Sequence, residues 1–194
     1  RSAQVQQANR ARTQQLMDNA AHFIDARHTR SGGSLTVTAQ VESSTIGHRF
    51  PTGFTSERQL WLAIRATDPE GALVFASGDL DDNGDLRNRW SAQVQAGQVP
   101  LDEQLHNLQS RNWLGDEELA LPLEADRIEL RGLEPLELRD FSWTFAAGEQ
   151  ALQIEISLLF RSFPPYLLRE LDLSALVPRL RTLTLDTLAL EVPP

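Results

Sequence analysis

Two short segments of this chain combine residue types that bind ligands in other proteins. Residues 47–54 read Gly-His-Arg-Phe-Pro-Thr-Gly-Phe, and residues 79–85 read Asp-Leu-Asp-Asp-Asn-Gly-Asp. The first segment is surrounded by a strand pattern but does not suit a strand itself. Proline cannot donate a hydrogen bond to a sheet, and glycine has no side chain to pack. We therefore expect residues 47–54 to form a shaped loop between two strands.

The acidic segment matches the first half of a calcium-binding loop. It places oxygen ligands at alternate positions, at Asp79, Asp81, Asn83 and Asp85, with a glycine for the sharp turn. The twelfth position is Trp90 rather than a bidentate glutamate, so the segment is not an EF-hand. Two interpretations are open at this point: a calcium site, or a solvated acidic hairpin loop.

His48 also has two interpretations. It is either a loop histidine held by the neighbouring backbone, or a contact or axial ligand for a group that comes from outside this chain. Imidazole is the usual axial donor to haem iron. The adjacent Arg49 and Phe50 would suit a haem propionate and a porphyrin edge, and they would equally suit ordinary packing.

The residue types exclude several kinds of site. The 194 residues include no cysteine, so this chain cannot form disulfides, thiolate metal sites or covalent c-type haem attachments. Its four histidines are scattered, without the spacing of a zinc site. There is no lysine for a phosphate-binding loop and no G-x-S-x-G nucleophile motif. We expect a protein that is not an enzyme and has no covalently bound cofactor.

Charge and hydropathy exclude some classes of binding partner. The net charge is −9, from 27 acidic and 18 basic residues, which argues against nucleic acid as a partner. No segment approaches the ~18 consecutive apolar residues of a membrane span. Aromatic residues in alternation would allow a glycan-binding surface, but such residues more often pack in a core. They are Trp61, Trp90, Trp113, Trp143, Phe141 and Phe145.

The elements that would position these segments are mainly strands. Residues 3–28 lack proline and glycine and favour a helix, which Gly32-Gly33 would end. Apolar residues then alternate with polar ones, which predicts six or seven strands, with a short helix within 101–114 and a short helix or crossover within 162–173. A change of apolar parity in the last strand predicts a bulge or bend near Asp186-Thr187. We expect a helix and linker over 1–31 and, over 34–194, an antiparallel β-sandwich of immunoglobulin-like type.

The chain resembles a known family through several separated motifs in a fixed order. It is similar to the C-terminal β-sandwich region of bacterial multihaem c-type cytochromes, over about residues 34–192. The motifs are residues 46–53 with Arg58 and Trp61, residues 67–68 with Gly71, residues 75–86, residues 99–111, residues 133–136 and residues 159–169.

The resemblance implies electron transfer in the periplasm or outside the cell. The haem-binding part of that family, with its C-x-x-C-H sites, is absent from this sequence. The resemblance therefore implies an accessory or scaffold domain that docks on or shields a multihaem cytochrome, from the same precursor or a separate subunit. In this interpretation His48 is the motif histidine that faces a haem. A calcium- or glycan-binding extracytoplasmic module is the alternative, and free edge strands would permit an oligomer.

Overall fold

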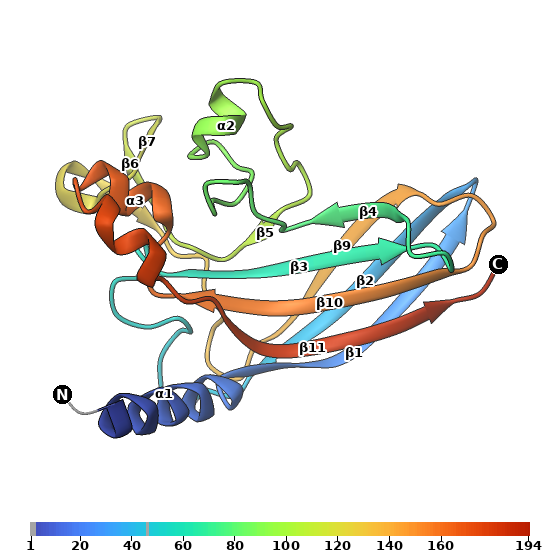
Figure 1. Cartoon of the computed structure of the whole chain (residues 1–194), viewed down its shortest axis with the longest axis horizontal. Coiled ribbons are helices and arrows are strands. Elements are labelled where there is room, and N and C mark those ends of the chain that lie inside the picture. The colour runs from blue at the N-terminus through green and yellow to red at the C-terminus, as the bar shows by residue number, and fades with distance from the viewer. Residues whose placement is uncertain (1–2, 46) are drawn as a thin grey trace.

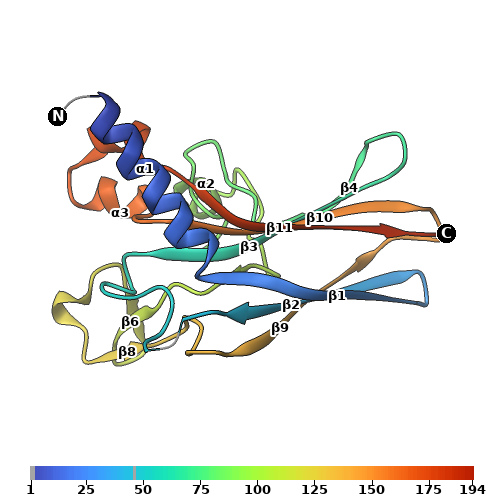
Figure 2. The ribbon, with the colours of Figure 1, turned by 90° about the horizontal axis from the view of Figure 1, so that it is seen from below.

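Alternating apolar residues build two antiparallel sheets that face each other. The computed structural model describes residues 3–45 and 47–194, and Figures 1 and 2 show the two layers. One sheet has the order β1-β2-β9, and the other has the order β11-β10-β3-β4 with β5 beside β3. Their strands are β1 (Ala21–Ser31), β2 (Ser34–Ser43), β3 (Gln59–Thr67), β4 (Leu73–Ser77), β5 (His106–Asn107), β9 (Leu138–Ala146), β10 (Leu152–Arg161) and β11 (Leu183–Val192). The predicted antiparallel sandwich is confirmed.

The core lies between the inward faces of these sheets. In β2 every second residue is buried, as the period of a half-buried strand requires. In β9, Phe141, Trp143 and Phe145 turn inward in the same way, and Trp143 has no exposed surface. From the opposite sheet, Ile156 and Leu62 complete the contact. The aromatic alternation of β9 is therefore core packing and not a glycan platform.

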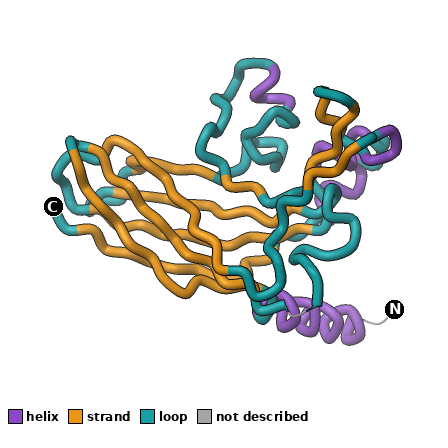
Figure 3. Tube along the Cα trace, turned by 180° about the vertical axis from the view of Figure 1, so that it is seen from behind, coloured by secondary structure: helices purple, strands orange, loops and turns teal. Residues whose placement is uncertain are grey.

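Smaller elements gather at one end of the sandwich, away from the C-terminus (Figures 1 and 3). A third, small sheet has the order β7-β6-β8. The elements outside the two large sheets are α1 (Ala3–Asp18), α2 (Ala92–Gln95), β6 (Arg111–Leu114), β7 (Glu117–Leu119), η1 (Pro122–Glu124), β8 (Arg127–Glu129), α3 (Pro165–Glu170) and η2 (Ser174–Arg179). None of the described helices has the length and apolar character needed to cross a bilayer.

The N-terminal helix is shorter than its sequence predicted. It ends at Asp18, and residues 21–31 form β1, which pairs with β2 from Ala21 opposite Ser43 to Ser31 opposite Ser34. The predicted boundary between 1–31 and 34–194 therefore falls inside a β-hairpin. Gly32 and Gly33 have φ of 58° and 80°, the conformation of a two-residue hairpin turn. Strand pairing outweighs the helix propensity of this segment.

Three further expectations concern local elements. The predicted bulge is confirmed, because the pairing of β10 with β11 shifts so that Leu185 is the extra residue. In the described part of residues 101–114 there is no helix; this segment contains β5 and β6 instead. The short helix predicted within 162–173 is present as α3.

Candidate functional site

Residues 47–54 form a loop between β2 and β3, as their composition predicted, and contacts on both sides anchor it. The backbone N–H and C=O of Phe50 both pair with Leu133, at 2.8 Å each. Gly132 permits this approach, because a Cβ there would lie 2.7 Å from the Phe50 carbonyl oxygen. Arg58 donates a hydrogen bond to the Thr52 carbonyl. Ile46, the first residue of the family motif, lies outside the described residues.

The three residues proposed to contact haem have different environments. His48 is exposed, and Thr45 Oγ1 donates a hydrogen bond of 2.9 Å to its backbone carbonyl. Arg49 forms an ion pair with Glu134. Phe50 is only 6% exposed and packs in the core against Phe160, with ring centroids 6.1 Å apart. The ring of Phe50 therefore supports the fold, and of the three only His48 is freely presented to solvent.

The acidic segment uses its carboxylates to shape its own loop. Asp81 Oδ1 accepts hydrogen bonds from the backbone N–H groups of Asn83 and Asp85, at 2.9 and 2.8 Å, and Oδ2 accepts one from Ser91 Oγ at 2.6 Å. Asp79 pairs with Arg87 at 2.5 Å. Within the described residues no three His, Asp or Glu side chains form a group that could hold a metal ion.

Asp85 joins the acidic loop to α3. Its carboxylate has no exposed surface, accepts a hydrogen bond of 2.8 Å from the Tyr166 backbone N–H and forms an ion pair with Arg169. Its neighbour Gly84 accepts a hydrogen bond of 2.6 Å from Arg161 through its carbonyl. The acidic loop is thus a structural connection between β4 and α3.

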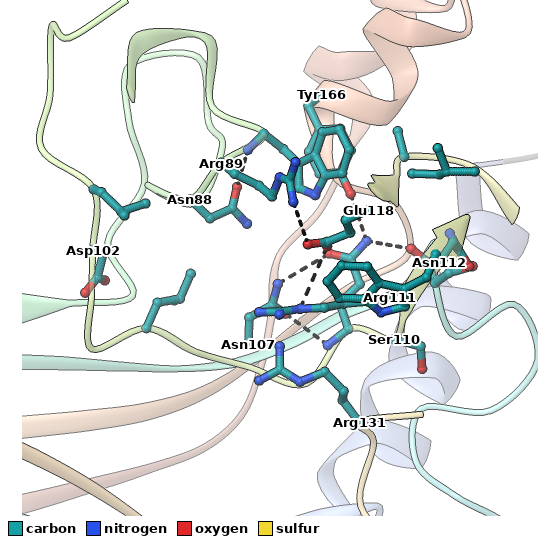
Figure 4. A pocket seen from close by; sticks show the side chains of 18 of the residues that line it. Asn88, Arg89, Asp102, Asn107, Ser110, Arg111, Asn112, Glu118, Arg131 and Tyr166 are labelled. Carbon is teal, nitrogen blue, oxygen red and sulfur yellow. Dashed lines mark hydrogen bonds and ion pairs between the residues drawn. The ribbon is translucent and has the colours of Figure 1, made fainter. Parts of the chain in front are cut away.

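A polar cavity of about 410 Å³ lies beside these segments, where the small sheet faces α3 (Figure 4). It is lined by Arg89 and Trp90 from the chain after the acidic loop, by Arg111 from β6, and by Glu118 from β7. Tyr166 of α3 closes one side. The Trp90 and Tyr166 rings are stacked, with centroids 5.4 Å apart and planes 13° apart.

One face of the small sheet supplies the charged groups. Arg111 is opposite Glu129 in the β6–β8 pairing, and Trp113 is opposite Glu118 in the β6–β7 pairing. Residues opposite each other, or two apart along a strand, share a face. Arg131 lies two residues beyond Glu129 and also lines the cavity. The register therefore brings these charged side chains together.

Glu118 is the central acid of this group. Its side chain is 9% exposed and lies 3.2 Å from Arg89 Nη1 and 3.8 Å from Arg111 Nε. Burial lowers the pKa of Arg131, and the nearby Arg111 guanidinium lowers it further, while Glu129 and Glu118 oppose the shift. Figure 4 shows Arg111 and Arg131 together below Glu118.

The sequence did not predict this cavity. Its residues come from six separate segments, and the strands that align the charged ones are three or four residues long, too short to show a period. Trp90 and Trp113, considered as a glycan surface, are the two members of the aromatic set that line the cavity. The one available signal was the alternation Arg111-Asn112-Trp113, followed in the sequence by two glutamate-containing segments, at 117–118 and at 129.

Comparison with known proteins shows a similarity of fold. No family model matches the sequence, and no curated protein matches it. Among solved structures, the chain is similar to a penta-haem cytochrome c552 from Thermochromatium tepidum, with a TM-score of 0.66 and 14% identity. The match covers 92% of this chain and 41% of that cytochrome chain. This chain therefore shares the fold of one part of a multihaem cytochrome. That part makes up less than half of the cytochrome chain.

Proposed function

We propose that this chain is a non-catalytic accessory domain of a multihaem c-type cytochrome assembly, in which it docks on or shields the haem-bearing part. The observation that carries the proposal is the fold similarity across 92% of the chain to 41% of a penta-haem cytochrome. The order of the sequence motifs points to the same class independently. The assembly would act in electron transfer in the periplasm or outside the cell.

The composition agrees with this role. With no cysteine, the chain cannot attach a c-type haem covalently, so the haem must belong to another part of the assembly. The exposed His48 is the residue on this chain that we propose to face that haem. Calcium binding gains no support from the acidic loop, whose Asp81 and Asp85 carboxylates accept hydrogen bonds from their neighbours.

Cross-linking in the native organism tests the proposal. A tagged chain would be cross-linked in intact cells, captured under denaturing conditions and digested for mass spectrometry. We expect cross-linked peptides from a polypeptide that carries C-x-x-C-H motifs, and a haem-stained band of the same mass. If the chain already lies in one polypeptide with such motifs, the cross-links will be internal to it. Recovery of the chain with cross-links only to proteins without haem would contradict the proposal.

A further inference from the structure

Two arginines in the cavity have donor groups that the fold does not use. Arg111 Nε is 3.8 Å from Glu118, and Arg131 Nε is 3.7 Å from Glu129, both beyond hydrogen-bonding distance. Within the described part of the chain, neither guanidinium donates a hydrogen bond to another residue. Their side chains are only 41% and 30% exposed. Two partly buried cations thus lie close together with most of their donors free.

Two other arginines of the same chain, Arg139 and Arg161, are held firmly by the fold. Arg139 donates to both carboxylate oxygens of Glu137 and to the carbonyls of Arg131 and Gly132, at 2.7–3.1 Å. Arg161 donates to Gln59 Oε1 at 2.5 Å as well as to Gly84. The contrast shows that Arg111 and Arg131 are not needed to satisfy backbone or side-chain acceptors. Their free donors point to an acceptor that is supplied from outside.

The local charge favours an anion with a single charge. Where the three cavity arginines meet, Arg89 and Arg111 pair with Glu118 and Arg131 pairs with Glu129, so these five side chains together carry one excess positive charge. Two more acids line the cavity, but Figure 4 places Asp102 on its far side, where it accepts hydrogen bonds from Ser77 Oγ at 3.0 Å and Gly78 N at 2.7 Å. The other, Glu103, is exposed. One carboxylate would neutralise the arginine side, and its two oxygens match the planar donor fork of a guanidinium.

The aromatic side of the cavity indicates what carries that carboxylate. The stacked rings of Trp90 and Tyr166 form a flat wall, and Arg89 lies over Trp90 at 5.2 Å from the ring centroid. A volume of about 410 Å³ is in the range of small-molecule sites and exceeds the needs of a carboxylate alone. The cavity therefore suits a carboxylate attached to a larger, partly apolar body.

We propose that this cavity is a carboxylate-binding site, in which Arg111 and Arg131 receive the carboxylate and the Trp90–Tyr166 wall flanks the body that carries it. Two sources share this chemistry. One is the propionate of a haem held by the cytochrome partner, and this source rests on the proposed function. The other is a free organic acid, which does not.

Binding of defined probes to the purified chain tests the site. The probes are a c-type haem peptide with free propionates, the same peptide with both propionates esterified, and phenylacetate, a monocarboxylate on an apolar ring. Isothermal titration should show binding of the free-acid peptide and at least tenfold weaker binding of the ester. Phenylacetate should compete with the free-acid peptide. Equal affinity for acid and ester, or no binding of either the peptide or phenylacetate, would overturn the proposal.

Variants locate the binding to the two arginines. Arg111→Gln and Arg131→Gln should each weaken binding at least tenfold, and Arg131→Lys should weaken it less. Arg65→Gln is the matched control, since Arg65 is an exposed arginine on β3 that does not line the cavity. Unchanged affinity in both glutamine variants would overturn the proposal. Far-UV circular dichroism would show whether a variant fails to fold. In that case the affinities of the unaltered chain for the free-acid and esterified haem peptides still test the proposal.

These experiments distinguish the two sources of the carboxylate. They also distinguish a failure of the cavity proposal from a failure of the proposed function. Binding of phenylacetate without binding of the haem peptide would confirm the carboxylate site and assign it to a free acid. Cross-links to a cytochrome that persist in Arg131→Gln would leave the proposed function intact and separate it from this cavity.

Discussion

At the scale of single residues, the acidic segment shows how a ligand-like spacing can serve the fold. The alternate oxygens of residues 79–85 resemble half of a calcium loop, yet Asp81 accepts backbone hydrogen bonds within the loop and Asp85 accepts one from α3. Sequence alone cannot distinguish a calcium ligand from a loop-stabilising residue. A carboxylate can accept a hydrogen bond from a backbone N–H as readily as it can bind a cation. The partner of Asp85 lies 81 residues away along the chain.

The structural role of Asp85 can be tested by substitution. Asp85→Asn removes a buried charge that pairs with Arg169, and it should lower the free energy of unfolding by about 1.5–3 kcal/mol. Asp79→Asn, in a pair whose acid is 49% exposed, should cost less than about 1 kcal/mol. Urea unfolding followed by tryptophan fluorescence measures both. Equal losses in the two variants would contradict this assignment.

His106 gives the stability a pH dependence. It contacts Phe141 and Trp143, with ring centroids 5.3 and 4.9 Å apart, and its Nε2 donates to the Ser142 carbonyl at 2.9 Å. Burial lowers its pKa below the usual 6.5, although the hydrogen bond to Ser142 opposes the shift. The unfolded chain therefore binds a proton at a higher pH than the folded chain. The contribution of His106 to stability is complete above pH 6.5 and is lost as the pH falls through the lowered folded pKa.

We expect the loss of stability between pH 7.5 and pH 5 to be smaller in His106→Gln than in the unaltered chain. Glutamine retains a donor for the Ser142 carbonyl but cannot take up a proton. Thermal unfolding at both pH values gives the comparison, and His28→Gln, at an exposed position of β1, is the control. The same pH slope in His106→Gln and the unaltered chain would rule out this role.

At the scale of elements, the alternation of apolar and polar residues identified the long strands β2, β9 and β10. It did not identify β1, which lies at the edge of its sheet. In β2, β9 and β10 one face is buried, so the period of two is visible in the sequence. In β1 most residues are at least partly exposed, so neither face of the strand requires apolar residues. The sequence of β1 therefore shows no alternation of polar and apolar residues. Its composition therefore favoured a helix, and only the Gly32-Gly33 pair indicated a hairpin.

Gly78 tests how closely the chain after β4 approaches β3. Its φ is 77°, and a Cβ there would lie 2.2 Å from the Leu62 carbonyl oxygen. Its own carbonyl accepts a hydrogen bond of 3.0 Å from the Trp61 indole. Gly78→Ala should therefore cost at least about 3 kcal/mol of folding free energy, from backbone strain together with the clash.

Gly97→Ala is the matched control for this substitution. Gly97 has a φ of 67° but nothing within 4 Å of an added Cβ, so the cost should be about 1 kcal/mol. Chemical denaturation measures the free energy of unfolding of both variants. The difference between them separates the cost of the clash at Gly78 from the cost of backbone strain, which both variants share. Equal costs would show that the close approach to β3 does not matter.

At the scale of the whole molecule, the sequence predicted the architecture better than the site. Strand periodicity predicted an antiparallel sandwich, the order of the motifs resembled a region of multihaem cytochromes, and the chain shares its fold with part of a penta-haem cytochrome. The arginine cavity could not be predicted, because tertiary structure alone brings Arg89, Arg111 and Arg131 to one place. The proposed haem contact at His48 and the cavity are independent features, and each can be tested without the other.

The central proposal is that this sandwich belongs to an assembly whose c-type haem is attached covalently outside this chain. The most direct measurement is the ratio of c-type haem to this chain in material purified natively from its source, by pyridine haemochrome absorbance and quantitative amino-acid analysis. The account predicts at least one haem for each copy of the chain through successive purification steps. A ratio that falls to zero while the chain is retained intact would contradict it.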